Sequence, residues 1–71
     1  MSEEEITKDI SARLGKIRKE LRYTQVQAAE IADLNPNYYA KIERGNSMPS
    51  VRTIKKIAKA LKVSATDILG F

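Results

Sequence analysis

The chain contains neither cysteine nor histidine among its 71 residues. Without cysteine, a disulfide framework and a thiolate metal site are both excluded. Without histidine, the chain lacks the commonest general base and the commonest metal ligand of proteins. The sequence also contains no pattern typical of a nucleophile–base pair, a metal-ligand cluster or a phosphate loop. We therefore expect no enzyme activity, no metal and no cofactor.

A long hydrophobic run is missing as well, which excludes a segment that could span a bilayer. The N-terminal residues Met1–Glu5 are acidic, whereas a signal peptide begins with basic residues. These features predict a soluble, cytoplasmic protein. The length predicts one domain over residues 1–71 with a thin core, which a dimer partner would help to stabilise.

The charge of the chain is unevenly distributed. Residues 1–10 carry one lysine against four acidic side chains, whereas residues 11–71 carry twelve basic and five acidic side chains. The net charge is therefore −3 in the first segment and +7 in the second. This balance favours a polyanionic partner, although a solvated basic surface would have the same composition.

Apolar residues at steps of three and four predict a long amphipathic first helix. They are Ile6, Ile10, Leu14, Ile17 and Leu21. The spacing predicts a helix over Glu3–Leu21 that begins with a capping box of Ser2 and Glu5. Residues 1–9 are expected to form an N-terminal extension of this helix that can fray.

Two short helices with separate start signals follow. Thr24 and Gln27 form the second capping box, and this helix is expected to reach Ala32. After the turn, Asn35 is a good N-cap and Pro36 suits the first helical position. This third helix is expected to cover Pro36–Arg44 and to stop at Gly45, the residue best able to take the left-handed conformation. Two short helices joined by a tight turn are typical of a helix-turn-helix, whose second helix enters the major groove of DNA.

The remaining residues predict two further helices. Ser50 is expected to begin a fourth helix, and Ser64 with Asp67 to cap a short fifth one. The predicted fold class is therefore all-α, with five helices and no strand.

Several segments, in their order and spacing, resemble the Cro/CI-type helix-turn-helix regulators, the lambda-repressor-like or XRE-type family. The matching segments are Ile17–Arg18, Thr24–Gln25, Ala29, Tyr38–Gly45, Pro49–Ser50 and Ile57–Ser64. The resemblance covers roughly residues 10–69 and implies a compact five-helix DNA-binding domain. Two positions depart from the family pattern, with Ala28 in place of leucine and Asp33 in place of a frequent glycine. We hypothesise that Tyr39, larger than the family's usual isoleucine or leucine, fills the volume left by Ala28.

The resemblance and the residue types together predict two sets of DNA contacts. Base-reading candidates lie at the tip and on the outward face of the third helix: Asn35, Pro36, Asn37 and Lys41. Asn37 and Lys41 have the side-chain donors for base edges, whereas Asn35 mainly caps the helix. Phosphate-binding candidates are Gln25, Tyr38, Arg44, Asn46, Ser50 and Arg52. For Tyr38, a DNA contact and a role in covering the edge of the third helix are equally open.

Two further roles follow from the resemblance. Arg18 and Glu43 match family positions that pair between the first and third helices, which implies a structural ion pair. Apolar residues near the end of the chain could either close the core or form a symmetric dimer patch. They are Leu61, Val63, Ile68, Leu69 and Phe71, with the first helix as a second candidate surface.

The predicted function is sequence-specific binding of double-stranded DNA by a transcriptional regulator. We expect a homodimeric repressor that recognises a near-palindromic operator. The resemblance implies a prokaryotic, phage or plasmid origin and association with the nucleoid, with no membrane and no small-molecule ligand as partner. The alternative is an antitoxin or interaction adaptor that binds a protein partner, with DNA binding secondary.

Overall fold

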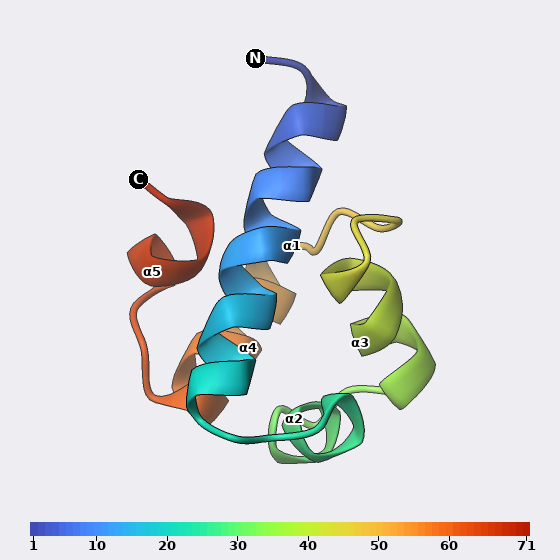
Figure 1. Cartoon of the computed structure of the whole chain (residues 1–71), viewed down its shortest axis with the longest axis vertical. Helices are drawn as coiled ribbons and strands as arrows, with labels where there is room; N and C mark the ends of the chain where they lie inside the picture. Colours follow the sequence, from blue (N-terminus) through green and yellow to red (C-terminus); the bar gives the residue numbers. More distant parts are fainter.

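The long first helix forms the axis around which the other helices pack. The computed structural model describes all residues 1–71, and α1 spans Glu3–Glu20. The Ser2–Glu5 capping box is present at its start, so the N-terminal extension is helical from Glu3 onwards. Figure 1 shows α1 along the long axis of the molecule. It packs against the third helix on one side and the fifth on the other.

Four shorter helices complete the fold: α2 (Gln25–Ile31), α3 (Pro36–Glu43), α4 (Val51–Leu61) and α5 (Ala65–Leu69). Each begins at the predicted N-cap, and the capping boxes of Thr24 and Ser64 are both formed. The predictions of five helices and no strand are confirmed. The helices α1, α2 and α3 each end one residue earlier than predicted, because the last predicted residue acts as the C-cap.

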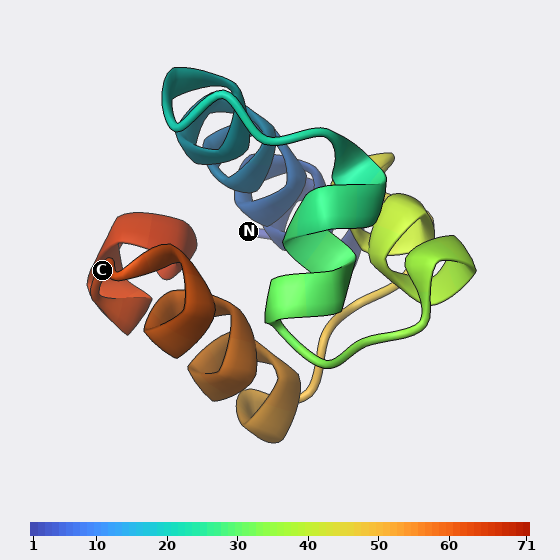
Figure 2. The ribbon, with the colours of Figure 1, turned by 90° about the horizontal axis from the view of Figure 1, so that it is seen from below.

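The consecutive helices α2 and α3 pack on each other, while α2 also contacts α4 and α4 contacts α5. Seen from below in Figure 2, α2 and α3 form an angular pair on the right, and α4 and α5 lie on the left. None of the helices combines the length and the apolar character needed to cross a membrane.

Four helices end with the same backbone pattern, in which one residue takes a positive φ. These residues are Arg22 (+63°), Asp33 (+56°), Gly45 (+79°) and Lys62 (+59°). In each case its N–H and the next N–H bond back to carbonyls of the last turn, as Tyr23 does to Arg18 and Asn46 to Lys41. This is the Schellman motif. The left-handed conformation expected of Gly45 is confirmed, and Asp33 takes it at the position where the family frequently has glycine, whereas the left-handed Arg22 and Lys62 were not predicted.

A single cluster of buried side chains contains residues from all five helices. Its largest fully buried members are Leu14, Tyr39, Ile42, Ile57 and Ile68. Ala28 and Ala29 of α2 are completely buried in the same cluster, so small side chains allow α2 to pack closely. The hydroxyl of Tyr39 is buried and has no hydrogen-bond partner of regular geometry. Tyr39 therefore contributes to the core through its ring rather than through a hydrogen bond.

The proposed compensation between Tyr39 and Ala28 can be tested by thermal and denaturant unfolding. We expect Tyr39→Leu to lower the unfolding free energy by about 1–3 kcal/mol, because it leaves a cavity. Tyr39→Phe retains the ring and removes only an unpaired hydroxyl, so it is the matched control and should be nearly neutral. Adding Ala28→Leu to Tyr39→Leu should restore part of the loss. An unchanged melting temperature for Tyr39→Leu would contradict the hypothesis.

Candidate nucleic-acid interface

The recognition-helix candidate α3 has a buried face and an exposed polar face. Tyr39, Ala40 and Ile42 are buried against the core. The four predicted base-reading residues Asn35, Pro36, Asn37 and Lys41 are all exposed. The structure therefore places them together at the start and on the outer side of one helix, as a base-reading role requires.

Asn35 has two functions that use different atoms of one side chain. Its Oδ1 accepts hydrogen bonds from the N–H groups of Asn37 at 2.8 Å and Tyr38 at 3.3 Å. This cap sets the start of α3 and leaves the amide NH₂ of Asn35 exposed at the tip of the helix. The capping role predicted for Asn35 is thus present, and its amide hydrogens are available to a ligand.

The segment that joins α3 to α4 and the first turn of α4 together contain most of the predicted phosphate-binding residues. Arg44, Asn46, Ser50 and Arg52 are all exposed there. The Ser50 hydroxyl caps α4, since it accepts from the Thr53 N–H at 3.1 Å and donates to Thr53 Oγ1 at 3.0 Å. A side-chain contact from Ser50 to phosphate would have to compete with these bonds, so Arg44, Asn46 and Arg52 have the freer donors.

The Tyr38 hydroxyl lies close to that of Thr53, which also bonds to Ser50. Tyr38 Oη lies 3.3 Å from Thr53 Oγ1, and the half-buried ring of Tyr38 packs against the core cluster. Tyr38 therefore covers the edge of α3, which is one of its two predicted roles, while its contact with DNA stays a prediction. Thr53 was not predicted, although its position three residues after the Ser50 cap is where an N-cap hydroxyl bonds.

The ion pair implied for Arg18 and Glu43 joins α1 to the last turn of α3. Arg18 Nη2 lies 2.6 Å from Glu43 Oε1, and Arg18 Nε lies 2.9 and 2.8 Å from the two carboxylate oxygens. The two side chains are only 12% and 6% exposed. A hydrogen-bonded fork of this kind fixes the geometry as well as the charge balance.

Other polar groups converge on the same carboxylate. Gln25 Nε2, at the start of α2, lies 3.4 Å from Glu43 Oε1. Arg18 Nη1 also donates to the Tyr23 carbonyl at 2.7 Å, which holds the segment between α1 and α2. The Ser11 hydroxyl donates to the Glu43 carbonyl oxygen. Gln25, predicted to bind phosphate, is therefore linked directly to α3 through Glu43 and indirectly to α1 through the ion pair.

These contacts change the proton affinities of the buried groups. Burial alone would raise the pKa of Glu43, but the hydrogen bonds from Arg18 and Gln25 together with the charge of Arg18 outweigh it and lower this pKa. The hydrogen bond to Glu43 raises the pKa of Arg18 despite its burial. Burial likewise raises the pKa of Tyr39 far above its ordinary range. All three groups thus keep one protonation state around neutral pH.

The apolar residues near the C-terminus separate into two groups. Leu61 and Ile68 are buried in the core, so they close it and present no surface to a partner. This finding corrects their inclusion among the dimer candidates. Val63 and Leu69 are half-buried against the same core, whereas Phe71 is 82% exposed. Of the five candidates, Phe71 therefore offers the most surface.

The packed α2–α3 pair, the exposed polar face of α3 and the anchored start of α2 define a helix-turn-helix. Residues 14–68 match the helix-turn-helix family HTH_3. The chain belongs to this family, the Cro/CI or XRE type of helix-turn-helix proteins.

Two phage proteins are similar in sequence. Over 61 residues, or 86% of this chain, it is 43% identical to the immunity repressor protein of Bacillus phage phi105 and covers 42% of that protein. Over 61 residues it is 34% identical to the cryptic phage CTXphi transcriptional repressor RstR of Vibrio cholerae serotype O1, covering 86% of this chain and 54% of that protein. The chain thus spans about half the length of these curated relatives.

Two solved structures confirm the fold class. The restriction-modification controller protein C.AhdI from Aeromonas hydrophila superposes with a TM-score of 0.85 at 26% identity, covering 87% of this chain and 94% of that one. An HTH_3 family transcriptional regulator from Vibrio cholerae superposes with a TM-score of 0.92 at 25% identity, covering 97% of this chain and 39% of that one.

The ion pair allows a prediction about stability. We expect Arg18→Met to lower the unfolding free energy by about 3–5 kcal/mol near neutral pH, because it leaves the Glu43 carboxylate buried without its partner. The double variant Arg18→Met/Glu43→Leu should recover much of the loss, since it removes both charges.

The lowered pKa of Glu43 sets the pH dependence of this loss. The stabilisation by the pair is complete above the ordinary carboxyl pKa of 4.5 and disappears as the pH falls through the lower folded value. In Arg18→Met the buried Glu43 has no cation beside it, so burial raises its pKa and the variant regains stability as that carboxyl is protonated. The difference in unfolding free energy between wild type and Arg18→Met should therefore begin to shrink above pH 4.5 and continue to shrink as the pH falls through the lowered wild-type pKa. Denaturant titrations at several pH values measure it, and a constant difference across the acid range would contradict the prediction.

Proposed function

We propose that this chain is a sequence-specific double-stranded DNA-binding domain that acts in transcriptional repression. The observation that carries the proposal is the exposed polar face of α3, capped by Asn35 and held against α1 by a buried ion pair. Rigid support matters because base readout requires side-chain donors to be placed within hydrogen-bond distance of base edges. The names of the two phage relatives, both repressors, support the same role.

Within this proposal, Asn37 and Lys41 contact bases, while Arg44, Asn46 and Arg52, between the end of α3 and the first turn of α4, bind phosphate groups. An asparagine amide can make two hydrogen bonds to the major-groove edge of adenine, at N6 and N7, and a lysine can donate to guanine O6 or N7. Arg44, Asn46 and Arg52 set the register of the protein on the duplex, because phosphate contacts carry no sequence information. Repression then results when the bound protein occupies an operator that polymerase needs.

The proposal includes a twofold dimer on a near-palindromic operator. A dimer would present two α3 helices about 34–36 Å apart, which is one turn of B-form DNA. A monomer of this size would contact too few bases to identify one site in a genome, since each correct base pair contributes only about 1–3 kcal/mol.

Selection from a randomised duplex pool, followed by binding to the winning site at several salt concentrations, tests the proposal. We expect enrichment of a near-palindrome that binds roughly 10³-fold or more above random DNA. Weak, unselective binding with a steep salt dependence would contradict it, and would direct attention to a protein partner instead.

Single substitutions separate the base-reading from the phosphate-binding residues. Asn37→Ala and Lys41→Ala should relax the selected sequence at particular positions, with a loss of about 1–3 kcal/mol of discrimination at each. Arg52→Ala should weaken binding to all duplexes alike and make the salt slope shallower by roughly one. Lys59→Ala, on the same helix as Arg52 but two turns further on, is the matched control and should change neither property. An unchanged selected sequence in both α3 variants would refute the base-reading assignment.

A further inference from the structure

The first half of α1 lies along the segment that joins α3 to α4. The Thr7 hydroxyl of α1 lies 3.9 Å from Met48 Sδ of this segment. Next to this contact the stem of Lys8 covers Gly45, with Lys8 Cγ 3.6 Å from the point that a Cβ atom of Gly45 would occupy. Glycine at this position therefore lets a lysine of α1 pack directly on the backbone of the α3–α4 segment.

The charged end of Lys8 is exposed beside two of the predicted phosphate contacts. Gly45, which the stem of Lys8 covers, is the chain neighbour of Arg44 and Asn46, and both of these side chains are exposed. A lysine stem can pack on the protein surface while its ammonium group remains hydrated. Lys8 is the one lysine or arginine among the first ten residues. The net negative charge of that segment therefore conceals a cation placed next to the candidate interface.

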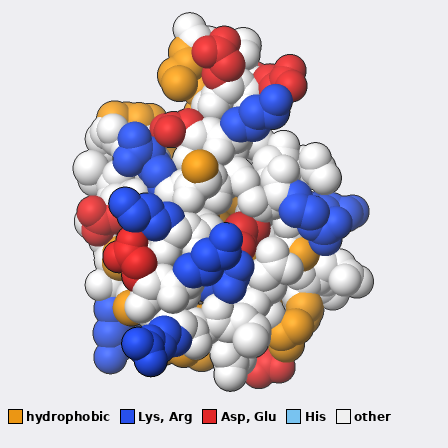
Figure 3. Space-filling model, viewed as in Figure 1, with side chains coloured by type: hydrophobic (Ala, Val, Ile, Leu, Met, Phe, Trp, Pro, Cys, Tyr) orange, Lys and Arg blue, Asp and Glu red, His pale blue; other side chains and the backbone are white.

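This ammonium group is paired with an acidic side chain of the same helix. Lys8 Nζ lies 3.2 Å from Glu4 Oε1, and the two side chains are 69% and 78% exposed. An exposed pair of this kind contributes little to stability, so another anion can replace the carboxylate at small cost. Glu4 and Asn46 line the same hollow of about 400 Å³, so the pair borders the segment where phosphate is expected. Figure 3 shows acidic and basic side chains next to one another near the N-terminal end of α1.

We propose that Lys8 binds a DNA phosphate group, and that Glu4 is the competing anion that holds Lys8 in the absence of DNA. On the duplex, the ammonium group leaves the Glu4 carboxylate and pairs with a phosphate near those expected at Arg44 and Asn46. Glu4 then weakens binding to all duplexes alike, because Lys8 must lose one anion to gain another and a phosphate contact carries no sequence information. The inference rests on the proposed function and adds α1 to the DNA-binding surface.

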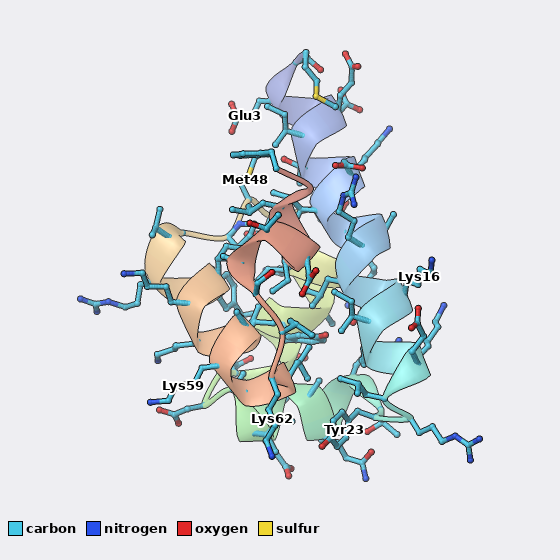
Figure 4. All side chains as sticks on the ribbon, turned by 90° about the vertical axis from the view of Figure 1, so that its left-hand side faces the viewer. Glu3, Lys16, Tyr23, Met48, Lys59 and Lys62 are labelled. Carbon is cyan, nitrogen blue, oxygen red and sulfur yellow. The ribbon has the colours of Figure 1, made fainter.

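Binding to the selected operator and to random duplexes at several salt concentrations tests the contact. We expect Lys8→Gln to weaken both about threefold at low salt and to make the salt slope shallower by roughly one. Lys16→Gln is the matched control, because it removes the same charge from another exposed lysine of α1. Figure 4 shows Lys16 further along α1, away from Glu3 and Met48. A Lys8→Gln variant whose affinity and salt slope equal those of the control would overturn the inference.

A double-mutant cycle tests the exchange of anions. Glu4→Gln frees Lys8 and should strengthen binding about threefold more than Glu20→Gln does. Glu20 is the control because it is an exposed carboxylate without an ion pair at the other end of α1. In the Lys8→Gln background the two substitutions should have equal effects, because the competing pair is already absent. The same excess gain from Glu4→Gln in both backgrounds would overturn the exchange. Far-UV circular dichroism verifies that each variant is folded.

These outcomes distinguish the inference from the proposed function. If the wild type selects a DNA sequence but Lys8→Gln binds like Lys16→Gln, the Lys8 contact is wrong and the function stands. If the wild type selects no sequence but Lys8→Gln still makes the salt slope for random DNA shallower than the control does, the contact stands and the sequence-specific function is wrong. A wild type that binds no DNA would overturn both.

Discussion

The ion pair between Arg18 and Glu43 is the interaction on which the geometry of the interface depends. It links α1 to the last turn of α3, and through Gln25 and the Tyr23 carbonyl it also holds the start of α2. Removing two charges from water is unfavourable, so such a pair is a poor source of net stability compared with a packed apolar pair. The pair contributes by fixing the orientation of α3 relative to α1, because a bidentate arginine–carboxylate pair tolerates only a narrow range of orientations. The helix that presents Asn37 and Lys41 is therefore oriented by charge geometry, whereas the core beneath it is held by apolar packing.

The starts of the helices were predictable from the sequence because capping is local. Ser2, Thr24, Asn35, Ser50 and Ser64 each bond to N–H groups two or three residues further along the chain, so no tertiary contact is needed to recognise them. The ends were less predictable. Gly45 signals a left-handed residue by its type, but Arg22 and Lys62 take the same conformation although it is unfavourable for residues with a Cβ atom. There the direction of the following helix, which tertiary packing sets, outweighs the local preference.

The candidate interface likewise combines features that the sequence predicts with features that only the tertiary structure shows. The exposed face of α3 could be predicted, since residue type and helical periodicity decide which side of a helix faces solvent. The bond that occupies the Tyr38 hydroxyl could not, because it depends on Thr53 of α4 lying against α3. Leu61 and Ile68 show the same limit, since an apolar residue near a chain end can equally close a core or face a partner. Only the packing of α5 against α1 and α4 distinguishes these two environments.

The start of α4 presents polar and apolar side chains within a few residues. Ser50 and Arg52 lie among the predicted phosphate contacts, while Met48 and Val51, which alternate with them along the chain, line an apolar groove. Neighbouring residues at a helix start point in different directions, so one short segment can direct donors to one side and apolar side chains to another. In the proposed function these donors set the register of the protein on the duplex, so the packing of the apolar side chains beside them would fix the direction in which the donors point.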